Sequence, residues 1–243
     1  MHAATPGVVT LTLDHPEKGN ALSAPLVERL SEGIQDAIAD PSVHTLVIQG
    51  AGRHFCTGFD LSDLEQETEG DLLYRFIQIE RLLSTLWHAP IRTVAIGQGH
   101  VLGAGADLFT ACDIRLAGPE TTFRFPGASF GLVLGTRRLA ERVGAERALA
   151  WTSSGAAIKQ EEAIACGLAN QSGDVVAAQP PAPYRTDRET FSALRAATRA
   201  DRRDQDLAAL VASIMNNSLK ARLLAHRDRA MAAAAQRKKA ASP

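Results

Sequence analysis

The sequence predicts a mixed α/β fold, because short apolar strands alternate along the chain with stretches of helical periodicity. Length and composition support this class. The 243 residues are 45% hydrophobic and 22% charged, which suffices for a large buried core and differs from disordered, collagen-like and disulfide-rich chains. The alternation stops near residue 175, and only helical patterns follow. We therefore expect an α/β core over residues 1–175 and a C-terminal helical tail over residues 176–243.

The first half of the core begins with a strand over residues 8–13, where apolar residues alternate with threonines. Ser23, a favoured N-cap residue, and Pro25 in the first turn then mark the start of a helix. A short apolar strand over residues 46–48 comes next. An amphipathic helix over residues 71–87 follows it, since apolar residues recur there at helical spacing.

The second half of the core repeats this order. A strand is predicted over residues 93–96, an alanine-rich helix ends at Ala111, and a further strand follows over residues 114–117. Strands that alternate with helices in this way are typical of α/β proteins.

The predicted tail is separated from the core by residues 173–183, which are rich in Gly, Ala and Pro and read as a linker. Two helices are expected beyond it, over residues 188–199 and 206–235, and the chain is expected to fray over residues 238–243. No strand pattern returns in this part of the sequence.

Charge and cysteine content exclude several classes of protein. The 26 basic and 27 acidic residues nearly cancel, whereas general nucleic-acid binders are usually more basic. Three widely spaced cysteines form neither a disulfide framework nor a metal-binding pair, which fits a reducing compartment. The N-terminus lacks the pattern of a signal peptide, and no apolar run reaches the ~18–20 residues of a membrane span. We expect a cytoplasmic protein that binds no metal, nucleic acid or membrane.

Two glycine-bearing segments, residues 53–61 and 97–107, each follow a short apolar strand. Glycines at such turns permit unusual backbone angles and let a ligand approach the main chain. A helix that starts there adds unpaired N–H groups and a partial positive charge. Two such turns that face one point would hold an oxyanion. The alternative, that the glycines serve turn geometry alone, stays open on these residues.

The second segment also resembles a dinucleotide-binding fingerprint, with Gly97, Gly99 and Gly103 followed by Glu120 about 20 residues later. That fingerprint normally opens its domain, whereas here several predicted elements precede it. It also leaves residues 55–61 unexplained. An NAD(P)-dependent oxidoreductase is therefore kept as a remote alternative.

Five segments in linear order resemble the crotonase superfamily, which comprises enoyl-CoA hydratases and isomerases. They are residues 8–23, which end in Asn-Ala-Leu-Ser, and residues 55–61, 97–107, 111–117 and 123–126. The resemblance covers roughly residues 8–170. It implies a crotonase-like spiral of β-β-α repeats with a C-terminal helical region. It also implies an acyl-CoA substrate, no cofactor apart from the coenzyme A of that substrate, and a homo-oligomer, trimer or hexamer.

Motif position assigns the site residues that the resemblance implies. The thioester oxygen would lie between the main-chain N–H groups of Phe59 and Ala104, where Ala104 replaces the usual middle glycine; such donors stabilise the charge of an enolate. Asp107 matches the first of two catalytic glutamates. The remaining positions implied to bind substrate are Arg53, Gly58, Asp60, Leu61, Ser62, Gly103 and Gly127. For Asp60 a capping role is the alternative, and for Arg53 a solvated surface position.

Two departures from the family pattern concern its chemistry. Gly127 stands where the second glutamate is expected, and the Asp107 stem is shorter than that of glutamate by ~1.5 Å. One carboxylate can move a proton between carbons, as double-bond isomerisation requires, but is poorly suited to position and split water. The sequence therefore favours isomerase-type or other single-carboxylate chemistry over efficient hydration. A catalytically weak acyl-CoA-binding or scaffolding relative is the alternative.

Two further departures concern shape. The turn over residues 131–136 is shorter than the family pattern, which would alter the pocket wall. Residues 207–229 resemble the helix that normally follows the core directly. Residues 185–206 would then be an insertion, and the usual terminal helices would be missing or replaced.

Overall fold

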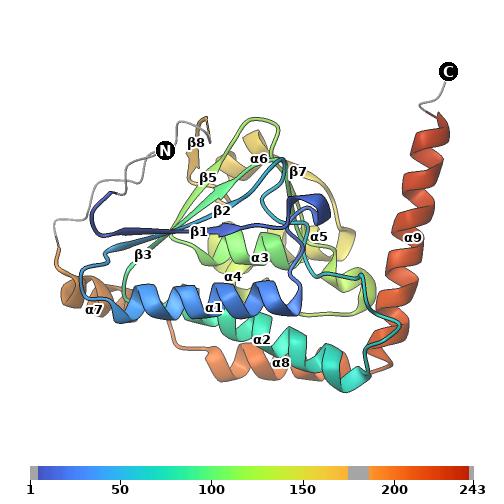
Figure 1. Cartoon of the computed structure of the whole chain (residues 1–243), viewed down its shortest axis with the longest axis horizontal. Helices are drawn as coiled ribbons and strands as arrows, with labels where there is room; N and C mark the ends of the chain where they lie inside the picture. The colour runs from blue at the N-terminus through green and yellow to red at the C-terminus, as the bar shows by residue number, and fades with distance from the viewer. Residues whose placement is uncertain (1–4, 175–185, 241–243) are drawn as a thin grey trace.

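The computed structural model describes residues 5–174 and 186–240, and within these ranges it has the mixed α/β architecture that the sequence predicts (Figure 1). A parallel sheet of five strands has the order β1-β2-β3-β5-β8. These strands are β1 (Val8–Leu13), β2 (Thr45–Gly50), β3 (Arg92–Gly97), β5 (Ile114–Ala117) and β8 (Gln171–Ser172). A second sheet pairs β4 (His100–Leu102) in parallel with β6 (Thr122–Arg124), which pairs in antiparallel fashion with β7 (Ile158–Lys159).

The helices of the core connect and cover these strands. They are α1 (Ala24–Ala39), α2 (Glu69–His88), α3 (Ala104–Ala111), α4 (Thr136–Val143), α5 (Ala145–Ser154) and α6 (Gln160–Ala165), with 3-10 turns η1 (Pro16–Lys18) and η2 (Pro126–Phe130). Two starts are set by side chains. Ser23 Oγ accepts from Leu26 N at 3.4 Å, as its residue type predicted. Thr68 and Asp71 form a reciprocal capping box at the start of α2.

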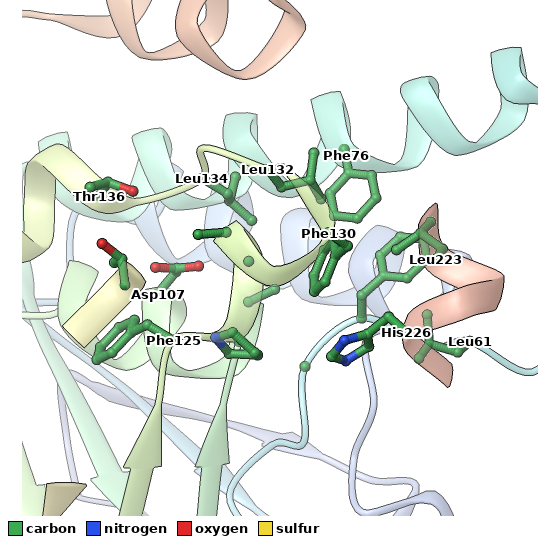
Figure 2. A pocket seen from close by; sticks show the side chains of 18 of the residues that line it. Leu61, Phe76, Asp107, Phe125, Phe130, Leu132, Leu134, Thr136, Leu223 and His226 are labelled. Atoms are coloured by element: carbon green, nitrogen blue, oxygen red, sulfur yellow. The ribbon is translucent and has the colours of Figure 1, made fainter. Parts of the chain in front are cut away.

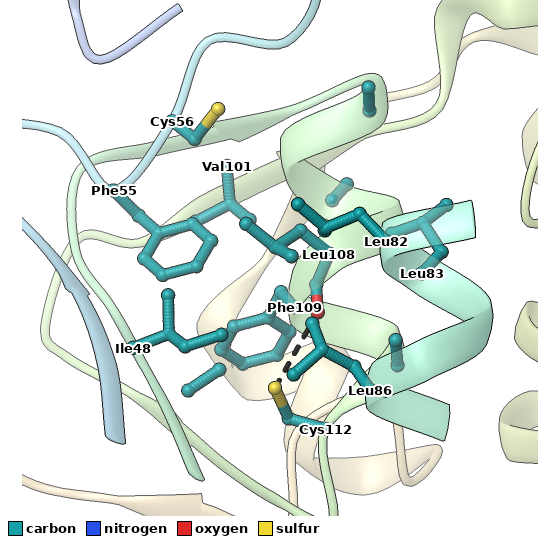
Figure 3. Close-up of a cluster of buried hydrophobic side chains, with 14 of the residues drawn as sticks. Ile48, Phe55, Cys56, Leu82, Leu83, Leu86, Val101, Leu108, Phe109 and Cys112 are labelled. Carbon is teal, nitrogen blue, oxygen red and sulfur yellow. Dashed lines mark hydrogen bonds between the residues drawn. The ribbon is translucent and has the colours of Figure 1, made fainter. Parts of the chain in front are cut away.

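The main core lies between the sheet and the helices α1, α2 and α3 (Figure 3). Phe55 and Phe109 meet edge to face there, with ring centroids 6.0 Å apart. Cys56 and Cys112 are fully buried in the same cluster, and burial raises the pKa of each thiol to about 12. Both thiols therefore stay protonated and behave as small apolar side chains.

The C-terminal region consists of α7 (Arg188–Thr198), α8 (Arg203–Met215) and α9 (Leu219–Ala240), and α9 projects from the body of the molecule (Figure 1). The prediction of one helix over residues 206–235 was wrong, because the chain breaks between α8 and α9. The Glu69 carboxylate accepts from the backbone N of Leu219 at 3.0 Å and so caps the start of α9. The expected fraying at residues 238–240 was also wrong, since α9 continues there; residues 241–243 lie outside the described residues.

These helices pack on the core through both polar and apolar contacts. Arg195 on α7 and Arg199, which directly follows this helix, both donate to the Trp87 carbonyl at the end of α2, and both bind the Asp113 carboxylate. Helices α8 and α9 join α2 in a second apolar cluster, whose buried members are Leu64, Leu72, Phe76, Leu132, Leu210, Ile214, Leu219 and Leu223. The predicted boundary near residue 175 and most of the predicted linker fall outside the described residues.

Within the described ranges, none of the helices combines the length and the apolar character needed to cross a bilayer.

Candidate active site

The two glycine-bearing segments lie side by side. Leu102 N donates to Cys56 O at 2.9 Å, and Cys56 N donates to His100 O at 3.3 Å. A β-carbon built on Gly58 would lie only 2.9 Å from the Leu102 carbonyl oxygen and 3.6 Å from the Ala104 nitrogen. Gly58 also has a φ of +99°, a region that favours glycine. The main chains of the two segments are therefore in direct contact.

In the second segment, residues 97–107, the path from strand to helix is longer than the sequence suggested. After β3 ends at Gly97, the strand β4 comes before α3, so no single turn joins strand to helix. A dinucleotide fingerprint has one such turn, with the phosphates at the start of the helix. The likeness of Gly97, Gly99 and Gly103 to that fingerprint is therefore limited to the spacing of the glycines.

The N–H groups of Phe59 and Ala104 lie where the two segments meet, and each points away from its neighbouring backbone acceptors. Leu22 N donates to Gly58 O at 2.7 Å, and Asp60 N donates to Leu22 O at 3.3 Å, so the intervening Phe59 N–H faces away from Leu22. Ala104 is the first residue of α3, where an N–H has no partner within the helix. Among the described residues, neither N–H donates to another backbone group.

A pocket of about 700 Å³, its open mouth included, lies beside these groups (Figure 2). Seven of the predicted site residues line it: Gly58, Phe59, Leu61, Gly103, Ala104, Asp107 and Gly127. Arg53, Asp60 and Ser62 do not. Most of the other lining side chains are apolar, as is typical of small-molecule sites.

Asp107 lies in the first turn of α3 and is only 6% exposed. Its carboxylate packs against the main chain of Gly135, where any β-carbon would overlap its oxygen. Burial raises the pKa of Asp107 well above its ordinary value; the positive charge of Arg138 opposes this shift and the negative charge of Glu80 adds to it. Asp107 therefore keeps its proton to a higher pH than an exposed aspartate.

The two charges that act on Asp107 belong to a buried network. Arg138 on α4 donates from Nη1 to Glu80 Oε2 on α2 at 3.0 Å, and its Nη2 lies 3.2 Å from Asp206 Oδ2 on α8. Glu80 and Arg138 are 2% and 1% exposed. Because such a pair is weakly screened, its field reaches the carboxyl group in the pocket.

Gly127 lines the pocket in η2 and presents no side chain to it. A β-carbon on Gly127 would lie 3.2 Å from the Leu132 carbonyl oxygen, a tight but adjustable contact. Of the residues that line the pocket, Asp107 and His226 are the titratable ones. The pocket wall thus holds one carboxylate.

The Asp60 side chain is tied into the protein outside the pocket. Its Oδ1 accepts from Ser62 N at 3.0 Å and from Ser62 Oγ at 2.6 Å, and Oδ2 lies 3.5 Å from Lys18 Nζ. Burial would raise the pKa of Asp60, but these hydrogen bonds and the Lys18 charge hold it below its ordinary value. The carboxylate thus closes a turn with Ser62, and the helix-capping alternative for Asp60 was wrong, because the next helix, α2, begins at Glu69 with Thr68 as its N-cap. Arg53 is exposed at the surface.

The C-terminal region supplies a wall of the pocket that the sequence did not predict. Leu223 and His226 on α9 line the pocket together with Phe130 of η2 (Figure 2). The His226 and Phe130 rings are 4.7 Å apart, and Ser129 Oγ lies 3.2 Å from His226 Nδ1. Burial and the Arg229 charge lower the pKa of His226. Helical spacing of Leu219, Leu223 and His226 was the signal available, but it does not reveal what that face contacts.

Comparison with known proteins identifies relatives of this chain. Residues 3–183 match the family model of enoyl-CoA hydratase/isomerase. A probable enoyl-CoA hydratase of Mycobacterium leprae, echA6, is 35% identical over 179 residues, which cover 71% of this chain and 70% of that protein. An ethylmalonyl-CoA decarboxylase of Mus musculus is 34% identical over 171 residues, which cover 68% of this chain and 52% of that protein.

A solved structure extends the similarity to the C-terminal region. A crystal structure described as a "putative enoyl-CoA hydratase/isomerase" of Bordetella parapertussis has a TM-score of 0.83 and 38% sequence identity, and the match covers 99% of this chain and 98% of that one. The fold shared with this protein therefore includes the helices beyond residue 185.

Proposed function

Since the chain belongs to the enoyl-CoA hydratase/isomerase family, we propose that it stabilises the enolate of an acyl-CoA thioester between the N–H groups of Phe59 and Ala104, with Asp107 as its acid–base group. The observation that carries this proposal is the contact between Gly58 and the first turn of α3, beside a pocket that Asp107 lines. Coenzyme A would enter as part of the substrate, with no separate cofactor.

Oxyanion stabilisation follows from how charge changes during the reaction. The thioester oxygen gains negative charge as an enolate forms, and fixed donors favour that state over the ground state. Loss of one such donor typically costs ~3–4 kcal/mol, or 10²–10³ in rate. Both donors belong to the main chain, so Ala104 can supply one without glycine's freedom; its side chain is accommodated with 6% exposure.

Isomerisation is the first reaction that Asp107 could support. The ionised carboxylate removes a proton from the α-carbon of a 3-enoyl-CoA, and the C–H electron pair becomes the dienolate. The double bond then moves to the α,β position as the same proton returns to the γ-carbon. This sequence needs one carboxylate and no water, which fits the presence of Gly127 in the pocket wall.

Decarboxylation is the second candidate, and the decarboxylase relative from mouse favours it. A substrate carboxylate on the α-carbon would leave as CO₂, and its bonding pair would become the same enolate. Asp107 in its protonated form would then deliver its proton to the α-carbon. The raised pKa of Asp107 and the apolar wall support this route, because both keep that proton in place.

The sign of the pH dependence separates the two reactions. Isomerisation requires the ionised form, so turnover should rise with pH through the pKa of Asp107; decarboxylation requires the protonated form, so turnover should fall. We would assay a 3-enoyl-CoA, ethylmalonyl-CoA and crotonyl-CoA with wild type and Asp107→Asn. Efficient crotonyl-CoA hydration would contradict the one-carboxylate argument. Turnover unchanged in Asp107→Asn, with CoA esters still bound, would favour the weakly catalytic alternative.

Three properties of the protein outside the site remain proposals. We propose a homo-oligomer, trimer or hexamer, which sedimentation analysis would test. We also propose that the protein acts in the cytoplasm and that the core and the helical tail form two folding regions.

Calorimetry with NAD(P) tests the remote oxidoreductase alternative, for which no heat of binding is expected.

A further inference from the structure

We propose that Arg75 on α2 is a positioning residue for the Phe59 N–H, a role that rests on the proposed function. Its Nη2 donates to the carbonyl oxygens of Asp60 at 3.0 Å and Leu22 at 3.3 Å. Its Cζ lies 3.9 Å from the centroid of the Phe59 ring. One guanidinium thus contacts the side chain of Phe59, the carbonyl of the next residue and the chain that pairs with it.

The hydrogen bonds of Arg75 lie on either side of the peptide group that carries the proposed donor. The peptide group between Gly58 and Phe59 carries the proposed donor, and its carbonyl is held by Leu22 N at 2.7 Å. Leu22 O in turn accepts from both Asp60 N and Arg75. Because Arg75 fixes the carbonyl on each side of this bridge, it restrains the rotation that would turn the Phe59 N–H away from the pocket.

Arg75 is itself held in place. Its Nη1 lies 2.7 Å from both carboxylate oxygens of Glu67, and the two side chains are 10% and 18% exposed. The next residue, Phe76, stacks on the Phe59 ring with centroids 4.3 Å apart and planes 9° apart. One turn of α2 therefore clamps Phe59 through two consecutive side chains, one by charge and hydrogen bonds and the other by stacking.

Loss of the Arg75 contacts should weaken stabilisation of the enolate more than binding of the substrate. The thioester in the ground state carries little charge on its oxygen and tolerates a poorly aligned donor, whereas the enolate depends on alignment. Loss of Arg75 should therefore lower kcat and leave KM nearly unchanged. A side chain that served stability alone would lower the melting temperature without changing how the folded site treats the enolate.

The test compares Arg75→Met with the conservative Arg75→Lys. It adds Arg75→Met combined with Glu67→Gln, so that the half-buried Glu67 carboxylate is not left without its partner. Arg81→Met is the matched control, since Arg81 is an exposed arginine on the same helix. Acetoacetyl-CoA is the spectroscopic probe, because its α-proton is acidic and its enolate absorbs in the ultraviolet. Each variant is measured for kcat, KM, melting temperature and the enolate band of the bound probe.

We expect Arg75→Met and the double variant to lose about 10- to 100-fold in kcat and most of the enolate band, with KM within about twofold. Arg75→Lys should recover part of both losses, and Arg81→Met should match wild type. Folded Arg75 variants that keep both kcat and the enolate band would overturn the role of Arg75 but leave the proposed function intact. A wild-type protein that neither forms the enolate nor turns over any acyl-CoA would overturn the proposed function and the inference with it.

Discussion

The pocket joins two regions of different origin, and Figure 2 shows them at its two sides. On one side Asp107 stands beside the turns that carry Phe59 and Ala104, where the proposed chemistry depends on backbone geometry. On the other side Leu223 and His226 come from α9, much later in the chain, and meet Phe130. The first region is set by local turns, whereas the second is set by packing between distant segments.

This difference predicts that the two regions respond differently to mutation. The hydrogen bond that a main-chain N–H makes weakens when the peptide group rotates slightly. It does not depend on the identity of most side chains, because the peptide group is the same in nearly every residue. A packed wall depends on side-chain volume, since interiors are close-packed and a removed group leaves a cavity. Changes in the turns should alter turnover, and changes in α9 should alter stability and substrate affinity.

Gly58→Ala should have the largest effect. Its β-carbon would meet the Leu102 carbonyl at 2.9 Å, and alanine disfavours the φ of +99°, so the main chain must move where the two turns touch. We expect kcat to fall about 100- to 1,000-fold, as for loss of one oxyanion donor. Steady-state kinetics on the best acyl-CoA substrate measures this loss.

Gly70→Ala is the control, because this glycine lies in the first turn of α2 and the nearest atom to a β-carbon there is Thr68 Oγ1 at 3.7 Å. Alanine should be neutral or slightly stabilising at this position. Equal activity of Gly58→Ala and Gly70→Ala would remove the backbone argument for the first region.

Leu223→Ala tests the second region. Leu223 is fully buried and belongs both to the pocket wall and to the apolar cluster that joins α8 and α9 to α2. Truncation should cost about 2–5 kcal/mol in the free energy of unfolding and raise KM, while kcat changes by less than about fivefold. Met231→Ala on the same helix is the control, since Met231 is 64% exposed. A loss of kcat as large as that of Gly58→Ala would mean that α9 takes part in the chemistry.

The same contrast explains how much of the site the sequence could predict. Phe59, Ala104 and Asp107 were assigned by their motif positions in the family resemblance, and all three line one pocket. Their catalytic roles stay predictions. The strands over residues 8–13 and 114–117 were found because alternation and apolar runs are local signals. These assignments needed no knowledge of distant partners.

Long-range contacts decided what the sequence could not predict. The break between α8 and α9 is set by the Glu69 carboxylate, which binds the start of α9, and by Arg222, which donates to the carbonyls of Ile214 and Asn217. Ser218, whose Oγ accepts from Ala221 N at 3.1 Å, is a local N-cap signal for this break, but no pattern within residues 206–235 reveals the contact with Glu69. The strands β7 and β8 have two residues each and are too short to show any period.

Gly127→Glu tests the chemistry of the first region, because it adds a second carboxylate to the pocket wall. The β-carbon meets the Leu132 carbonyl at 3.2 Å, so that loop must shift by a few tenths of an ångström, which limits the gain. We expect crotonyl-CoA hydration to increase about tenfold, below the 10²–10⁴ of a well-placed acid or base. Gly127→Gln is the control without charge. Equal hydration by the two variants would show that the missing carboxylate does not limit this reaction.

Asp107→Asn should stabilise the fold by an amount that depends on pH. Burial raises the pKa of Asp107 in the folded protein well above its ordinary value, so the folded state binds this proton more tightly than the unfolded state. The carboxyl group therefore destabilises the fold progressively as pH rises from about 4 through its folded pKa, because ionisation in the buried site is unfavourable. The neutral amide removes this penalty. The melting temperature of Asp107→Asn should exceed that of wild type at pH 8, and the difference should shrink as the pH falls toward 4. Thermal denaturation of both proteins across this range measures it, with Asp63→Asn as an exposed control. A difference that is constant with pH would mean that Asp107 titrates alike in the folded and unfolded chains, and the acid–base role proposed for it would lose its electrostatic basis.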